Sequence, residues 1–101
     1  MKLIWSRRAT RDLDQIGSFI SLGAPERARA FVQTLIERGK QAAKFPNAGR
    51  IVLELQDENV RELIEGNYRI VYEISSAKKT VVVLTVFEGH RLLKKSLSQK
   101  E

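Results

Sequence analysis

The chain has 101 residues, of which 43% are hydrophobic, and it contains no cysteine. This length suits one domain with a single hydrophobic core. The absence of cysteine excludes disulfides, zinc–thiolate sites and thiol nucleophiles, and it suits a reducing compartment. The sequence shows no signal-peptide pattern, and its longest apolar run, residues 81–86, is too short to span a membrane. We therefore expect a cytoplasmic protein without membrane association.

The charge of the chain is concentrated in its first half. Lysine and arginine number 18 against 12 aspartate and glutamate residues, which gives a formal net charge of +6. Residues 1–50 carry ten basic and four acidic side chains, whereas residues 51–101 carry eight of each. A basic half favours association with nucleic acid or with an acidic protein, although a merely soluble basic surface would give the same count.

The first half of the sequence has the apolar spacing of helices. Residues 2–5 are typical of a short strand, and Ser6 is a suitable N-cap for a helix that follows it. Hydrophobic side chains recur at three- and four-residue spacing over residues 8–21 and again over residues 25–44. Pro25 fits the first turn of the second of these segments. The pattern predicts a helical hairpin with a short connector.

The second half changes to the pattern of β-strands. Strands are expected at residues 51–55, 60–65, 68–74 and 80–88. Gly66-Asn67 is a two-residue hairpin signal, with glycine first as a type II′ turn prefers. A tight turn there places residue 65 opposite residue 68, and residue 61 opposite residue 72.

Side-chain alternation separates this hairpin into two faces. One face carries Leu63, Ile70 and Tyr72, and we expect it to pack on the helices. The other face carries Glu62 and Arg69, and we expect it to be open to solvent. The predicted fold class is α+β, with an N-terminal strand and a helical hairpin packed on a twisted, mainly antiparallel sheet.

Few side chains of the sequence point to chemistry. One histidine and no cysteine leave no ligand set for a metal, and no glycine-rich loop is present to cradle phosphates. We therefore expect no metal and no cofactor. His90, at the exit of the last strand, is either a general acid or base or an exposed turn residue. Arg69 is either a cation for a phosphate or transition state, or half of an ion pair with Glu62.

Other residues of the first half also allow two interpretations, a role in binding or a role in the fold. Arg7 and Arg8 lie in the first turn of the first helix, where the macrodipole disfavours cations. This small local cost suggests a use in binding, although exposed arginines also tolerate such a position. Four aromatic residues are expected in the core rather than on a base-stacking platform: Trp5, Phe19, Phe31 and Phe45.

The block Gly66–Ile74, followed by the valine-rich segment Val81–Arg91, resembles the RelE/ParE superfamily. These proteins are the toxin halves of bacterial type II toxin–antitoxin pairs. The pattern Trp5-Ser6 and the hairpin beginning at Pro25 agree with it. The likeness extends over about residues 2–93, so we divide the chain into a toxin domain, residues 1–93, and a basic tail, residues 94–101.

The superfamily holds two activities. RelE-like members cut mRNA on the ribosome, whereas ParE-like members poison DNA gyrase without a recognised hydrolytic site. A RelE-like site would use Arg69 at the scissile phosphate, together with His90 and Arg91. The catalytic tyrosine that RelE has after its last strand has no counterpart here, and the long hairpin is more ParE-like. We therefore predict a gyrase poison, with a ribosome-dependent endoribonuclease as the alternative and a non-toxic nucleic-acid-binding domain as a second alternative.

The resemblance also implies two binding surfaces. A cognate acidic antitoxin would wrap the helical hairpin in a heteromeric toxin–antitoxin complex. The residues assigned to the antitoxin are Arg7, Arg8, Arg11, Phe19, Arg27 and Phe31. The residues assigned to the target, gyrase or the ribosome with its mRNA, are Arg61, Arg69, Arg91, Lys94 and Lys95.

Overall fold

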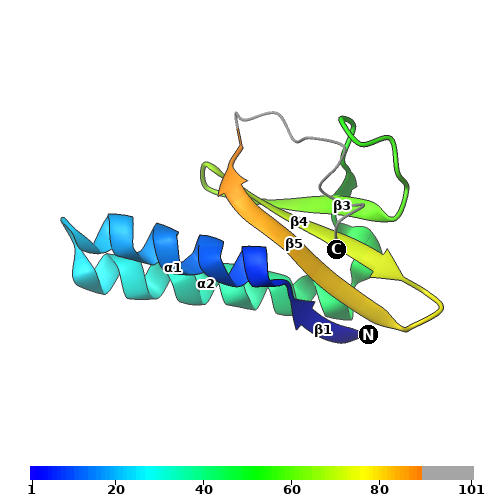
Figure 1. The fold of residues 1–101 in the computed structure, drawn as a ribbon, viewed down its shortest axis with the longest axis horizontal. Coiled ribbons are helices and arrows are strands. Elements are labelled where there is room, and N and C mark those ends of the chain that lie inside the picture. The colour runs from blue at the N-terminus through cyan, green and yellow to red at the C-terminus, as the bar shows by residue number, and fades with distance from the viewer. Residues whose placement is uncertain (90–101) are drawn as a thin grey trace.

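The computed structural model describes residues 1–89 of the chain (Figure 1). The elements, in chain order, are β1 (Lys2–Trp5), α1 (Arg7–Ser21), α2 (Pro25–Lys44), the short 3-10 helix η1 (Pro46–Ala48), β2 (Arg50–Ile51), β3 (Val60–Glu65), β4 (Tyr68–Ser75) and β5 (Thr80–Glu88). The basic tail and the predicted site residues His90, Arg91, Lys94 and Lys95 lie outside the described residues.

The strands form one sheet in the order β1-β5-β4-β3-β2. β1 pairs in parallel with β5, and the other three pairings are antiparallel, which confirms the predicted fold class. The register of the β3–β4 hairpin is also as predicted, with Glu65 opposite Tyr68 and Arg61 opposite Tyr72. Gly66 supplies the positive φ of 58° that its turn requires.

The strand expected at residues 51–55 is largely absent. β2 ends at Ile51, although the Val52 nitrogen still donates to the Val60 carbonyl at 3.1 Å. The Leu55 nitrogen then donates back to the Val52 carbonyl at 3.3 Å, so the chain curls into a loop instead of following β3. The apolar residues that suggested a strand are used to cover the sheet, as described below.

The helical hairpin packs on one face of the sheet, and both helices have the predicted bounds to within one residue (Figure 1). Ser6 caps α1 as expected, because its side chain accepts a hydrogen bond from the Ala9 nitrogen at 3.0 Å. The shared core contains Ile16 and Leu35 from the helices and Tyr72 from the sheet. None of the helices within residues 1–89 combines the length and the apolar character needed to cross a membrane.

Two of the four aromatic residues predicted in the core are exposed instead. Phe19 is 72% exposed and lines an open hollow with Tyr68 and the end of β5, near the part of the hairpin that extends beyond the sheet (Figure 1). Phe45, just after α2, is 59% exposed. The prediction holds for Trp5 and Phe31, which pack against the main cluster of buried residues.

The second face of the sheet is not open, contrary to expectation. Glu62 and Arg69, which we expected in solvent, are only 4% and 5% exposed. The loop between β2 and β3 folds over this face and inserts Val52 and Leu55 between the side chains of the strands. A second apolar cluster results, whose members are Val52, Leu55, Val60, Val71 and Leu84.

Tyr72 joins the sheet to the segment that follows α2. Its hydroxyl accepts a hydrogen bond from the Gly49 nitrogen at 3.0 Å and donates one to the Pro46 carbonyl at 2.7 Å. Burial raises the pKa of the Tyr72 hydroxyl, so the phenol stays protonated and remains a donor. Gly49 is the residue that lets the backbone approach this closely, because a Cβ there would meet the Tyr72 hydroxyl and the Glu62 carbonyl.

We expect Gly49→Ala to destabilise the fold by about 1–3 kcal/mol, the usual cost of overpacking a buried site. The added Cβ would lie 2.7 Å from the Glu62 carbonyl oxygen, which belongs to the backbone of β3 and has little room to move. Urea unfolding measures the loss. The matched control is Gly23→Ala in the helical connector, where nothing lies within 4 Å of the new methyl group. Equal stability of the two variants would contradict this account.

Candidate functional site

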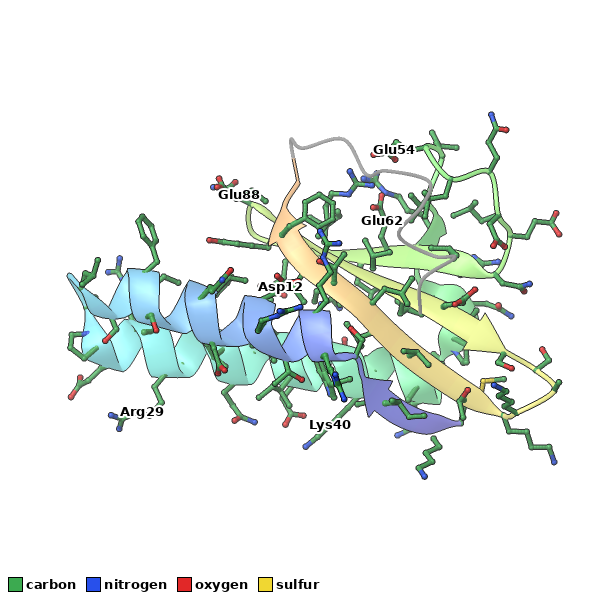
Figure 2. The ribbon with its side chains drawn as sticks, viewed as in Figure 1. Asp12, Arg29, Lys40, Glu54, Glu62 and Glu88 are labelled. Carbon is green, nitrogen blue, oxygen red and sulfur yellow. The ribbon has the colours of Figure 1, made fainter. Side chains whose placement is uncertain are left out.

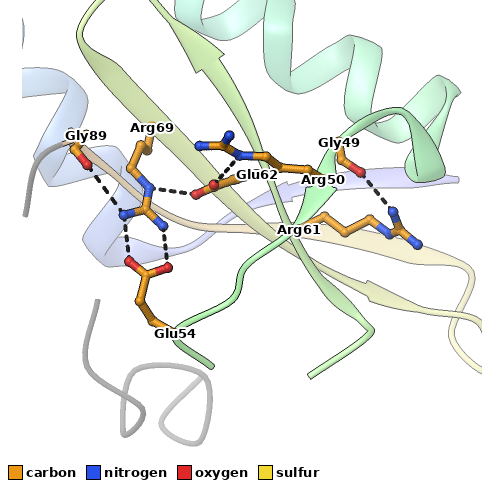
Figure 3. A network of polar contacts seen from close by, with 7 residues as sticks. All are labelled: Gly49, Arg50, Glu54, Arg61, Glu62, Arg69 and Gly89. Carbon is orange, nitrogen blue, oxygen red and sulfur yellow. Dashed lines mark hydrogen bonds and ion pairs between the residues drawn. The ribbon is translucent and has the colours of Figure 1, made fainter. Parts of the chain in front are cut away.

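Arg69 lies at the centre of the second face of the sheet and contacts two carboxylates (Figure 3). Its Nε donates to the Glu62 Oε1 at 2.6 Å. Its two terminal nitrogens donate to the two oxygens of Glu54, at 2.8 and 3.0 Å. The contact with Glu54 is therefore bidentate, which is the strongest arrangement of an arginine–carboxylate pair.

The sheet and the loop each supply one of these carboxylates. Glu62 is opposite Val71 in the β3–β4 register, so it is the diagonal neighbour of Arg69 on the same face, as predicted from alternation. Glu54 belongs to the loop that covers this face, and nothing in the sequence spacing indicated its contact. Sequence reasoning missed it, because the pairing depends on a loop conformation that has no periodic signature.

Two further contacts fix the guanidinium of Arg69. Its Cζ lies 5.2 Å from the centroid of the Phe87 ring, which gives a cation–π contact. The Gly89 carbonyl oxygen lies 3.5 Å from NH1 (Figure 3). The pKa of Arg69 is raised above its ordinary value, chiefly by the hydrogen bond to Glu54 and also by Glu62, against the opposing effect of burial. The side chain is therefore a permanently charged group in a protein interior.

Glu62 is shared between two arginines. Its second oxygen accepts a hydrogen bond from the Arg50 Nε at 2.6 Å, so each carboxylate oxygen has one guanidinium partner. The Arg50 side chain is 68% exposed, whereas that of Glu62 is 4% exposed. Arg50 therefore stands at the rim of the site and Glu62 lies at its base. Together with Glu54 and Arg69, they carry two positive and two negative charges.

An open groove of about 500 Å³ lies over this network. Its lining residues are Arg50, Ile51, Leu53, Glu54, Arg61, Glu62 and Arg69. Arginine guanidinium groups in such a groove are suited to oxyanions, but Glu54 occupies the donor edge of Arg69. Within residues 1–89 there is no group of three or more histidine, cysteine or acidic side chains that could hold a metal ion.

Arg61, which we assigned to the target, lines the groove, but its guanidinium extends towards Gly49 and away from Arg69 (Figure 3). Its NH1 donates to the Gly49 carbonyl at 2.8 Å, and its side chain is half-buried. The structure therefore gives Arg61 a contact with the segment after α2 and does not group its guanidinium with that of Arg69. The other three residues assigned to the target, apart from Arg69, lie outside the described part of the chain.

The six residues assigned to the antitoxin do not form one compact patch. Arg7, Arg8 and Arg11 are exposed near the start of α1, while Phe19 is exposed twelve residues beyond Arg7. A helix rises about 1.5 Å per residue, so these two ends of the surface are roughly 18 Å apart. Arg27 is exposed at the start of α2, near the Phe19 end.

Phe31, the sixth of these residues, is held in the fold. Its ring packs against the Tyr68 ring with a centroid distance of 5.4 Å, and it borders the main core. Only part of the Phe31 side chain is therefore accessible to a partner. The exposed members of the proposed surface run along the length of the hairpin, which suits an extended or helical partner better than a globular one.

Asp12 is a second polar connection that sequence reasoning did not identify. Its Oδ2 accepts hydrogen bonds from the Thr85 hydroxyl at 2.5 Å and from the Val86 nitrogen at 3.0 Å. This carboxylate lies between α1 and β5 (Figure 2) and joins the helical layer to the part of β5 that continues beyond its pairing with β1. The β4–β5 register shifts at Val71/Tyr72, beside the residues that Asp12 binds. We therefore regard Asp12 as a structural residue.

The chain matches known proteins over most of its length. A family model described as the ParE toxin of type II toxin–antitoxin system, parDE, matches residues 3–93. The Y4kP protein of Sinorhizobium fredii is 32% identical over 92 residues, which cover 89% of this chain and 90% of that protein.

Solved structures agree with this result. The chromosomal ParDE TA system from P. aeruginosa superposes with a TM-score of 0.72 at 26% identity, over 87% of this chain and 95% of that chain. The intact E. coli RelBE toxin–antitoxin complex gives a TM-score of 0.63 at 18% identity, over 89% of this chain and 98% of that chain, and this likeness concerns the fold alone. Given the family model and the relative of similar length, the chain belongs to the ParE toxin family of type II toxin–antitoxin systems, within the RelE/ParE superfamily.

Proposed function

We propose that the protein arrests bacterial growth by inhibiting DNA gyrase, and that an acidic antitoxin neutralises it. The observation that carries the choice of target is the state of Arg69. A nuclease of this superfamily would need that arginine at the scissile phosphate, but here it is 5% exposed and both of its terminal nitrogens are bonded to Glu54. A ParE-like activity does not require Arg69 to contact a scissile phosphate.

The comparisons support the same choice. The matching family model is that of the ParE toxin, and the ParDE system of P. aeruginosa has the higher TM-score and identity of the two toxin–antitoxin structures described above. The ribosome-dependent nuclease stays as the alternative, since the fold is shared with RelBE complexes. Family membership weakens the remaining alternative, a non-toxic nucleic-acid-binding domain.

The partner proposal rests on charge and on shape. The solved relatives are toxin–antitoxin systems, and residues 1–50 of this chain carry an excess of six positive charges. An acidic segment laid along the hairpin would meet Arg7, Arg8 and Arg11 at one end and the exposed Phe19 at the other. Such a complex would be heteromeric, with the contact surface on the helical layer and the Arg69 groove on the opposite face of the sheet.

We expect Arg69→Ala to destabilise the fold strongly, by about 3–5 kcal/mol, because it removes the buried cation that pairs with both Glu62 and Glu54 and leaves Glu62 with the exposed Arg50 as its partner. An exposed arginine–carboxylate pair would give a much smaller loss of stability. The control is Arg50→Ala, which removes the exposed guanidinium from the same carboxylate and should cost about 1 kcal/mol or less. Urea unfolding of both variants tests the ranking, and a small, equal loss in both would show that Arg69 has no structural role.

Purified protein is expected to inhibit supercoiling of relaxed plasmid by gyrase and to leave mRNA on programmed ribosomes uncut. Both assays should use the same preparation and the same range of concentrations. Cleaved mRNA with unaffected supercoiling would establish the nuclease instead.

Removing residues 94–101 should weaken gyrase inhibition roughly tenfold, equal to about 1.4 kcal/mol of binding free energy. The matched control is Lys2→Ala with Lys78→Ala, which removes the same net charge of two from exposed positions elsewhere.

Charge reversal on α1 should impair neutralisation by the antitoxin. The variant Arg8→Glu with Arg11→Glu should reduce antitoxin affinity by about tenfold or more at low salt, and less at high salt, because like charges then face each other. Affinity is measured by calorimetry with the acidic product of the adjacent gene, and growth on co-expression gives a second readout. The control reverses Arg29 and Lys40, which point away from the sheet on α2 (Figure 2). Equal losses in both variants would mean that the effect is general electrostatics and not a surface on α1.

A further inference from the structure

Leu53 is an apolar side chain that the loop between β2 and β3 presents to solvent. It is 83% exposed, whereas Val52 before it and Leu55 after it are 0% and 3% exposed. Both of these residues are inserted in the second apolar cluster, and the Val52 nitrogen donates to the Val60 carbonyl at 3.1 Å. Leu53 cannot turn inwards unless Val52 or Leu55 leaves the sheet. Its outward position is therefore fixed by the packing of the loop.

Leu53 borders the same groove as a second apolar side chain and an exposed arginine. Ile51 is 37% exposed, the Arg50 side chain is 68% exposed, and both line this groove of about 500 Å³. Arg50 donates to Glu62 through Nε, and within residues 1–89 no acceptor contacts its two terminal nitrogens (Figure 3). A guanidinium edge of this kind suits a carboxylate. The rim thus offers apolar contacts beside a group that binds a negative charge.

This combination favours a protein partner over a nucleic acid. Leucine and isoleucine gain free energy when they are buried against other apolar groups, which a phosphate backbone does not offer. Three arginines and two glutamates line the groove, so its formal charge is only +1, whereas surfaces that follow a phosphate backbone are strongly basic. Protein interfaces combine an apolar centre with arginine. A loop already held in place also loses little conformational freedom on binding.

The groove lies on the side of the molecule that the antitoxin surface leaves open. The residues assigned to the antitoxin belong to the helical layer, and the groove is on the opposite face of the sheet. The Gly89 carbonyl oxygen is 3.5 Å from NH1 of Arg69, and the basic tail assigned to the target begins five residues later in the sequence. The chain therefore continues towards this tail from a point beside the groove, so one partner can meet both.

We propose that Leu53 is the apolar anchor with which the toxin docks on its protein target. The target surface that fits it has an apolar pocket for Leu53 and, at the edge of this pocket, a carboxylate that pairs with Arg50. This inference rests on the proposed function, under which the target is gyrase, and it identifies the face of the toxin that gyrase contacts.

The test is inhibition of gyrase supercoiling by Leu53→Ser, with Leu22→Ser as the matched control. Leu53→Ser should raise the concentration for half-inhibition by about 10- to 100-fold, which corresponds to the loss of one buried leucine side chain. Leu22 is 86% exposed at the end of α1, outside the groove, and its substitution should leave inhibition unchanged. Both side chains are exposed, so the two variants should melt close to the wild type. Leu53→Met keeps an apolar side chain of similar volume and should retain inhibition.

Two further measurements identify the partner and its chemistry. Arg50→Ala should weaken gyrase inhibition more at low salt than at high salt, because salt screens the contact with a carboxylate. Leu53→Ser should bind the acidic product of the adjacent gene as tightly as the wild type does. Weaker binding of that product with intact gyrase inhibition would assign Leu53 to the antitoxin and overturn the proposal. Equal gyrase inhibition by the wild type and Leu53→Ser would overturn this inference alone, whereas a wild type that leaves gyrase unaffected would overturn the proposed function and this surface together.

Discussion

The fold depends on burying both faces of a five-stranded sheet with one helical layer among the residues that the structure describes. Within residues 1–89, the hairpin of α1 and α2 covers one face, and the short loop between β2 and β3 covers the second. That loop contributes two large apolar side chains, Val52 and Leu55, which is little cover for three central strands. The remaining cover comes from an ion network in which Arg69 draws Glu54 of the loop onto the sheet. The conformation of the loop and the burial of Arg69 therefore depend on each other.

A buried ion network of this kind is a weak source of net stability. The attraction between the charges mostly repays the cost of removing them from water, so a well-packed apolar group can serve as well or better. Its distinctive property is its sensitivity to the loss of a partner. Removing one charge leaves an opposite charge in a medium that solvates it poorly, and the penalty then exceeds what the intact contact contributed. The network holds the loop in one arrangement more firmly than its net energy would suggest.

Much of this architecture could be predicted from the sequence, because it follows from periodicity. The apolar spacing gave the bounds of both helices, and the Gly66-Asn67 turn gave the register of β3 and β4. Alternation also placed Glu62 beside Arg69 correctly. These features are local, or depend on one turn, so residue order is enough to specify them.

The errors concern what covers each surface, which periodicity does not encode. Alternation separates the two faces of a hairpin but does not say which irregular segment folds over one of them, so the second face was wrongly expected in solvent. The apolar residues after Ile51 were taken as a strand, although their role is to insert from a loop. Phe19 has the spacing of a core residue, but its side chain is 72% exposed. The partnership of Arg69 with Glu54 joins residues fifteen positions apart through such a loop.

The two members of this pair are not equivalent, and the difference comes from their positions in the site. Without Arg69, the Glu62 carboxylate, whose side chain is 4% exposed at the base of the network, is left with the exposed Arg50 as its partner, and Glu54 loses its bidentate contact. Without Glu54, Arg69 keeps its contact with Glu62, and its guanidinium still borders a groove that opens to solvent. The loss of Arg69 removes a cation whose side chain is 7% exposed, whereas the loss of Glu54 removes a carboxylate whose side chain is 25% exposed. The depth of each partner thus decides how strongly a break in the network destabilises the fold.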